Sequence, residues 1–138
     1  MKVFVDTNIL IDYVGKREPF FIPAKSVFAM CYLGKIEIVI SGLSIVNLLY
    51  ICRKLDLSSL KSKLLGLSQY IEIVDLPSEM ILSGLKSGWT DYEDFLQHET
   101  ALANKCDCIL TRNPDDFSIS SLPVYNASDF IALLCGRV

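Results

Sequence analysis

The chain has 138 residues, with 13 Lys and Arg against 16 Asp and Glu, a formal net charge of -3 and a hydrophobic content of 51%. A chain of this length can bury a core that needs neither disulfides nor a structural metal. Its acidic balance argues against broad, salt-driven binding of nucleic acid. We therefore expect one domain over residues 1–138, with some apolar surface buried against a partner.

Cysteine usage and the N-terminus indicate a compartment. The five cysteines are odd in number and scattered through apolar segments, and the N-terminus lacks a charged stretch followed by an apolar core and a cleavage site. The longest uncharged stretch, residues 38–52, is too short to span a bilayer. These features predict a cytoplasmic protein with free thiols and no membrane segment.

The chain opens with an apolar run, residues 3–5, that ends at Asp6. An uninterrupted run of this kind is typical of a parallel strand covered on both faces. Thr7 and Asn8 supply turn and cap chemistry for a helix over residues 9–14. Asp6 thus falls at the carboxyl end of a strand, where open α/β sheets place their ligands. Helix capping alone would also explain an Asp or Thr here, so the rest of the chain has to decide.

Helices and strands alternate along the rest of the chain. Periodicity and turn residues predict helices over residues 20–33, 45–54, 58–68, 77–86, 90–105 and 128–135. They predict strands over 36–40, 70–76 and 107–111, and a short extended piece at 124–125. Ser44 is expected to cap the helix over 45–54, and Thr90 with Glu93 to form a capping box on the helix over 90–105. This order predicts an α/β fold with a central, mostly parallel sheet of four or five strands, the first strand in the middle and helices on both faces.

Two further acidic clusters would share one edge of the sheet with Asp6. Asp91, Glu93 and Asp94 begin the helix that leads into the fourth strand, and residues 113–116 (Asn-Pro-Asp-Asp) follow that strand. The helix dipole explains Asp91 and Glu93 well and Asp94 less well, and Asn-Pro-Asp-Asp is ordinary turn chemistry. Together, however, these acids can converge on one crevice. Carboxylates without His, Cys or Lys partners suit Mg²⁺ or Mn²⁺, which can activate water for phosphodiester cleavage.

Three segments carry a recognisable pattern. They are residues 3–8 (VFVDTN), residues 91–95 (DYEDF) followed by 101–103 (ALA), and residues 109–113 (ILTRN) ending in 116–117 (DF). In this order and spacing the chain resembles the PIN-domain nucleases, and in particular the VapC-like bacterial toxins. The resemblance implies a PIN-like three-layer fold and a metal-dependent endoribonuclease that uses Mg²⁺ or Mn²⁺. It also implies an antitoxin partner and, with the high apolar content, a homodimer.

The resemblance assigns roles position by position. Asp6 and Asp94 match the principal metal-binding acids, Asp116 matches the outer acidic position, and Asp91 matches an accessory acid found in part of the family. These four acids and Asn47 form the predicted catalytic set. Candidate substrate-binding residues are Thr7, Asn8, Arg112 and Asn113.

One position departs from the family pattern. The helix after the second strand usually carries an acid, most often Glu, and this chain has Asn47 there. A neutral carbonyl ligand predicts weaker metal binding or more dependence on Asp91, whereas a capping partner for Ser44 is the simpler role. The alternative function is therefore a catalytically weakened PIN-like module that binds RNA or protein. A dehalogenase-like phosphatase and a receiver domain are disfavoured, since they would want an Asp at Asn8 or at residues 76–77.

Overall fold

The computed structural model describes residues 1–136, so the last two positions of the predicted domain lie outside the described residues. The strands are β1 (Lys2–Val5), β2 (Glu37–Ser41), β3 (Glu72–Val74), β4 (Cys108–Leu110) and β5 (Val124–Tyr125). The helices are α1 (Thr7–Val14), α2 (Phe21–Tyr32), α3 (Gly42–Ile51), α4 (Leu57–Leu67), α5 (Ser78–Leu85), α6 (Tyr92–Ala103) and α7 (Ala127–Cys135), with a 3-10 turn, η1, at Pro114–Phe117.

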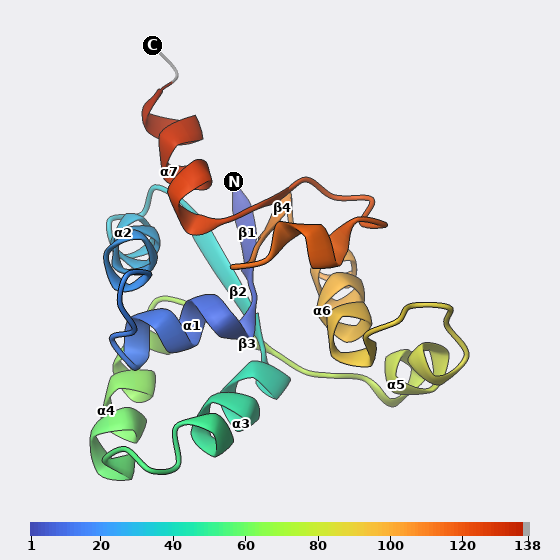
Figure 1. Ribbon diagram of the computed structural model, residues 1–138, viewed down its shortest axis with the longest axis horizontal. Coiled ribbons are helices and arrows are strands. Elements are labelled where there is room, and N and C mark those ends of the chain that lie inside the picture. Colours follow the sequence, from blue (N-terminus) through green and yellow to red (C-terminus); the bar gives the residue numbers. More distant parts are fainter. Residues whose placement is uncertain (137–138) are drawn as a thin grey trace.

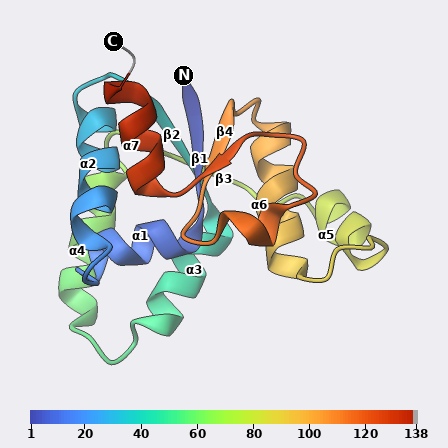
Figure 2. The same ribbon diagram turned by 45° about the horizontal axis from the view of Figure 1, so that its top comes forward.

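The five strands form one parallel sheet in the order β3-β2-β1-β4-β5. Helices α1, α2, α3, α4 and α7 lie on one face, and α6 with α5 and η1 lies on the other (Figure 1). Figure 2 shows the same division from a second direction. The predicted α/β class, the helices on both faces and the central place of the first strand are confirmed.

Side-chain alternation along β1 explains why both faces are covered. Val3 and Val5 belong to the larger core beneath the five helices, whereas Phe4 belongs to the smaller core beneath α6. Successive side chains of a strand point to opposite faces, so a central strand with helices on both sides must be apolar at every position. Residues 38–40 of β2 divide between the two cores in the same way.

Two helices begin at caps other than the predicted ones. Ser41 caps α3 by accepting a backbone N–H, and Ser44 lies fully buried inside that helix. Asp91 caps α6 in the same manner, so the predicted capping box of Thr90 and Glu93 is wrong. In each case a side chain at the end of the extended segment reaches the first free N–H groups. Ser44 and Glu93 are thereby left for other contacts.

No helix within residues 1–136 is long and apolar enough to cross a membrane. All five cysteines are free thiols, and Cys135 alone among them is exposed. The prediction of free thiols is confirmed.

Helix α5 approaches α6 closely at Gly84. A Cβ added there would clash with Tyr92 Cε1 and stand 2.9 Å from Phe95 Cδ1. Gly84→Ala should therefore destabilise the protein by about 1–3 kcal/mol through overpacking. Gly66→Ala is the matched control on α4, because its Cβ would meet nothing within 4 Å, and it should gain up to about 1 kcal/mol from helix propensity. Urea unfolding measures both, and equal stability of the two variants would contradict the prediction.

Candidate active site

Asp6 ends the central strand and also caps α1. Its side chain is only 5% exposed and accepts hydrogen bonds from the Thr7 backbone N–H at 2.8 Å, Gln97 Nε2 at 3.1 Å and Thr111 Oγ1 at 2.8 Å. A carboxylate has about four lone-pair directions, so Asp6 keeps one of them for a further partner. Capping and a ligand role are therefore compatible at this residue.

A buried polar network holds Asp6 in place. Gln97 is fully buried on α6, and besides Asp6 its Nε2 lies 3.3 Å from Thr7 Oγ1 and 2.9 Å from Ser44 Oγ. The Thr7 and Ser44 hydroxyls are 2.7 Å apart. The network joins the first turns of α1 and α3 to the middle of α6. Gln97 Oε1 is buried and has no hydrogen-bond partner within residues 1–136, so it is a free acceptor for a water or a cation.

The other acids surround Asp94 at the start of α6. Burial, followed by the negative charges of Asp91, Asp6, Asp116 and Glu93, raises the pKa of Asp94 to about 7. Burial likewise raises the pKa of Asp6, and hydrogen bonds from its neighbours oppose that rise. The charges that act most strongly on Asp94 are all negative. This edge of the sheet therefore carries concentrated negative charge.

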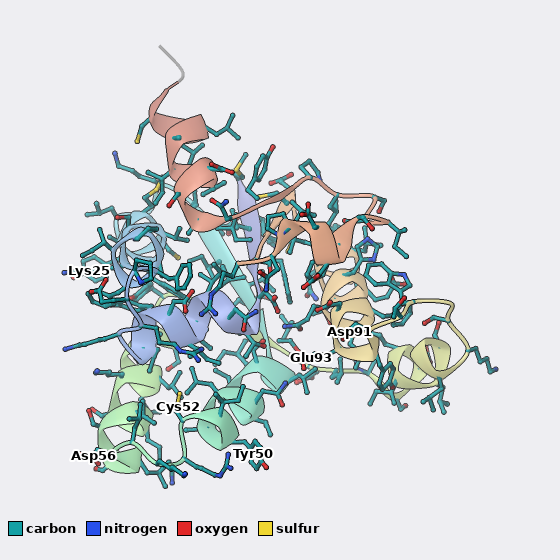
Figure 3. The ribbon with its side chains drawn as sticks, viewed as in Figure 1. Lys25, Tyr50, Cys52, Asp56, Asp91 and Glu93 are labelled. Atoms are coloured by element: carbon teal, nitrogen blue, oxygen red, sulfur yellow. The ribbon has the colours of Figure 1, made fainter. Side chains whose placement is uncertain are left out.

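Glu93 faces this site instead of capping its own helix. Thr7 Oγ1 lies 3.5 Å from Glu93 Oε1, and the Asn47 side chain hydrogen-bonds to the same carboxyl group. Burial of the carboxyl group, followed by the charge of Asp6, raises the pKa of Glu93, whereas the Asn47 and Thr7 hydrogen bonds lower it. Figure 3 shows Glu93 and Asp91 at the N-terminal end of α6, with Glu93 on the side toward α1 and α3.

The remaining candidates lie near the acids but are less enclosed. Asn113 and Asp116 are exposed on the segment after β4, and the Asn113 carbonyl accepts a hydrogen bond from the Asp116 N–H at 3.1 Å. Asn8 is half-buried in the first turn of α1. The predicted acids thus act on one another near the carboxyl end of β1, and Thr7 and Asn47 contact Glu93 there. Asn8 follows Thr7 in α1, and Asn113 lies on the segment after β4.

Arg112 has a partner that the sequence did not suggest. Its Nε donates to Asp12 Oδ2 at 3.2 Å, and its second nitrogen bonds to Asp12 Oδ1. The guanidinium also lies 4.3 Å from the centre of the Phe20 ring. Because Asp12 is 1% exposed, this pair ties α1 to the segment after β4. These contacts give Arg112 a structural role, and its predicted contact with the substrate stays a prediction.

Two site residues were missed from the sequence. Gln97 carries no charge, and Glu93 was assigned to a cap. The available signal was spacing, because Gln97 stands three residues after Asp94 and four after Glu93, which places all three on neighbouring positions of one helical face.

The donors at this site fit a hard divalent cation. Carboxylate and amide oxygens are the ligands that Mg²⁺ and Mn²⁺ take in proteins, and both Asp6 and Gln97 keep a free acceptor. Within residues 1–136 no three acidic, His or Cys side chains are close enough to enclose an ion. The acids therefore meet at Coulombic range and not at ligand range.

A family model described as PIN domain matches residues 2–115. The chain belongs to the PIN domain family. A search of curated proteins gives no match.

Several solved structures have a fold similar to that of this PIN domain. VapBC2 from Rickettsia felis, bound to a DNA fragment from its promoter, is 20% identical, with 91% of this chain and 98% of that chain covered and a TM-score of 0.64. A toxin-antitoxin complex from Klebsiella pneumoniae is 21% identical, with 91% and 97% covered and a TM-score of 0.66. VapC20 of Mycobacterium tuberculosis, a sarcin-ricin loop cleaving toxin, is 10% identical, with 85% and 94% covered and a TM-score of 0.66. At these identities the likeness shows the fold.

In this PIN domain Asp94 should make stability depend on pH. Its pKa of about 7 exceeds the ordinary value of 3.8, so the folded state holds an extra proton between these values. The stabilisation is fully present below 3.8 and is lost as pH rises through about 7. Asp94→Asn avoids that loss. Above neutral pH and without metal, the variant should unfold about 2–4 °C higher than wild type, which corresponds to about 1 kcal/mol.

Calorimetry in a chelator, across a pH series, measures this difference. Asp115→Asn is the matched control, because Asp115 is exposed beside Asp116 and is not among the charges that act most strongly on Asp94. A gain from Asp94→Asn that is equally large in acid and alkaline buffers would contradict the assigned direction.

Proposed function

We propose that this PIN domain is a metal-dependent endoribonuclease and the toxin of a toxin–antitoxin pair. The observation that carries the proposal is the set of acids around Asp94, whose charges are all negative. Membership of the PIN domain family supports nuclease chemistry, and the VapBC2 and toxin-antitoxin neighbours support the biological setting. The free thiols support a cytoplasmic protein.

The cation, Mg²⁺ or Mn²⁺ held by Asp6 and Asp94, supplies a polarised water and offsets charge on the phosphodiester. The chain supplies the frame. Gln97 and Thr111 fix the direction of the Asp6 carboxylate through hydrogen bonds. Asp94 is charged above a pH of about 7, and Asp91 and Asp116 add negative charge that attracts a cation.

Substrate contacts are proposed for the rim of the site. Asn8 and Asn113 offer side-chain amides to phosphate oxygens, and Thr7 orients the acids from within the network. Asn47 contributes a neutral amide that hydrogen-bonds to Glu93. The acidic balance of the chain implies that these local contacts, together with the cation, position the RNA.

Asp6→Asn should lower cleavage of a mixed RNA pool in Mn²⁺ at least about a hundredfold, because a neutral amide cannot replace the charge of a buried ligand. Asp115→Asn makes the same chemical change on an exposed acid and should cleave like wild type. Denaturing gels across a Mn²⁺ titration give the measurement, and circular dichroism checks the fold of each variant.

Two results of that experiment would contradict the proposal. Equal cleavage by all three proteins without metal would identify a contaminating nuclease. A folded wild-type protein that neither cleaves RNA nor binds Mn²⁺ would identify the alternative, a PIN-like module that binds RNA or protein.

An apolar groove supports the antitoxin partner. It has a volume of about 660 Å³ and lies between α1, α2 and α4, with Tyr13, Phe21 and Tyr70 among its lining residues. Lys25 and Lys63 also line it, so the groove suits an amphipathic antitoxin segment that carries acidic side chains.

The outer side of α3 supports a homodimer. Val46 and Tyr50 are 65% and 66% exposed, and Ile51 next to them is 50% exposed. Figure 3 places Tyr50 on α3 and Lys25 on α2, on separate parts of the surface. Two copies that bury this apolar strip against each other would form a symmetric interface.

The two surfaces can be tested against each other by light scattering on protein purified from its native host, where an antitoxin should co-purify. Ala29→Arg fills the groove, which Ala29 lines, so this variant should lose the antitoxin and keep the dimer mass. Val46→Glu puts a charge on α3, so it should keep the antitoxin and halve the mass. A wild-type monomer, or an Ala29→Arg protein that still holds the antitoxin, would contradict the assignments.

A further inference from the structure

The side of the site that faces α3 has a carboxylate, but α3 does not provide it. Asn47 is the residue of α3 that faces the site, and its side chain is neutral. The group in contact with it is the carboxylate of Glu93, which reaches across from the first turn of α6. Figure 3 shows Glu93 lying toward α3 from α6.

Glu93 is joined to Asp6 by the buried network. Gln97 Nε2 donates to Ser44 Oγ at 2.9 Å, the Ser44 and Thr7 hydroxyls are 2.7 Å apart, and Thr7 Oγ1 is 3.5 Å from Glu93 Oε1. Hydroxyl hydrogens can therefore run from Ser44 to Thr7 and from Thr7 to Glu93. The same Gln97 amide donates to Asp6 at 3.1 Å. One network thus directs two carboxylates from different elements.

Helix capping does not explain this placement. Asp91 already accepts the Asp94 N–H at 3.0 Å, so α6 is capped without Glu93. Interaction with the helix dipole would be satisfied equally well by a Glu side chain in open solvent. Glu93 instead lies where the charge of Asp6 acts on it, which costs energy in a protein without a cation.

A second observation points to a ligand at the same place. Gln97 is fully buried and contacts Asp6, Thr7 and Ser44, yet its Oε1 has no hydrogen-bond partner within residues 1–136. Buried acceptors of this kind are normally paired. This acceptor belongs to the side chain that already donates to Asp6, so a water or a cation beside Asp6 would satisfy it.

We infer that Glu93 becomes a third carboxylate ligand when a cation offsets the repulsion that keeps the acids at Coulombic range. Thr7 and Asn47 hold Glu93 on the side of the site where α3 carries no charge. This inference rests on the proposed function, because it concerns the same cation as Asp6 and Asp94. Glu93 would then be a ligand from the same helical turn as Asp94, and Asn47 would be a positioning residue that acts through Glu93.

Isothermal titration of the metal-free full chain with MnCl₂, above the Asp94 pKa of about 7, tests this directly. Glu93→Gln should bind Mn²⁺ about ten- to a hundredfold more weakly than wild type. Glu79→Gln is the matched control, since Glu79 is an exposed acid on the neighbouring helix α5, and it should bind like wild type.

The decisive variant is the exchange Asn47→Glu with Glu93→Gln. It swaps carboxylate and amide across one hydrogen bond and leaves the net charge unchanged, so it should recover most of the affinity that Glu93→Gln loses. Thermal unfolding without metal supplies the structural control. Glu93→Gln should be at least as stable as wild type there, because it relieves repulsion from Asp6.

The outcomes separate the inference from the function on which it rests. Wild type that binds Mn²⁺, with Glu93→Gln equal to Glu79→Gln, overturns the inference and leaves the proposed function standing. Lower affinity that the exchange does not recover also overturns it, as does a Glu93→Gln protein that unfolds more easily without metal. Wild type that binds no Mn²⁺ overturns the proposed function itself.

Discussion

Repulsion among carboxylates at the end of β1 is the constraint that the surrounding structure has to accommodate. Asp6 is buried and negatively charged groups act on its neighbour Asp94, so the fold must supply compensation without a basic side chain at that point. It does so with dipoles. The first turns of α1, α3 and α6 all meet here, and helix N-termini carry partial positive charge. The hydroxyls of Thr7 and Ser44 and the amide of Gln97 add neutral donors that stabilise the acids without filling the place of a cation.

The parallel sheet makes this meeting of helix ends unavoidable. Strands β1, β2 and β4 run side by side in the same direction, so the segments that leave them begin at one edge. The first of these segments starts α1 and the second starts α3, while the third carries Thr111, whose hydroxyl reaches Asp6. The two cores on either side of β1 hold these elements rigidly. Precise side-chain placement at the edge is thus a product of apolar packing in the centre.

The sequence predicted the frame better than the contacts within it. Periodicity located β1 and Asp6 because a buried parallel strand has few alternatives, and the acids of residues 91–94 followed from their place before the fourth strand. The sequence did not predict which side chains contact each other when the two residues come from distant segments. Arg112 meets Asp12 across a separation of 100 residues, and Gln97 meets Ser44 across 53. Thr90 was preferred over Asp91 as a cap because local spacing cannot tell which side chain the loop turns toward the helix.

The register of β1 between β2 and β4 has a consequence for the order of events during synthesis. Val3 pairs with Cys108 of β4 on one side and with Ile38 of β2 on the other. Strand β1 can therefore pair with β4 only after the last third of the chain has begun to be synthesised. Closing a loop of that length is entropically costly and slow. Until β4 docks, Asp6 has neither Thr111 nor the acids of α6 opposite it. A nascent chain, or one cut short before this point, therefore lacks an assembled site, and whatever chemistry the site performs begins only after nearly the whole polypeptide has left the ribosome.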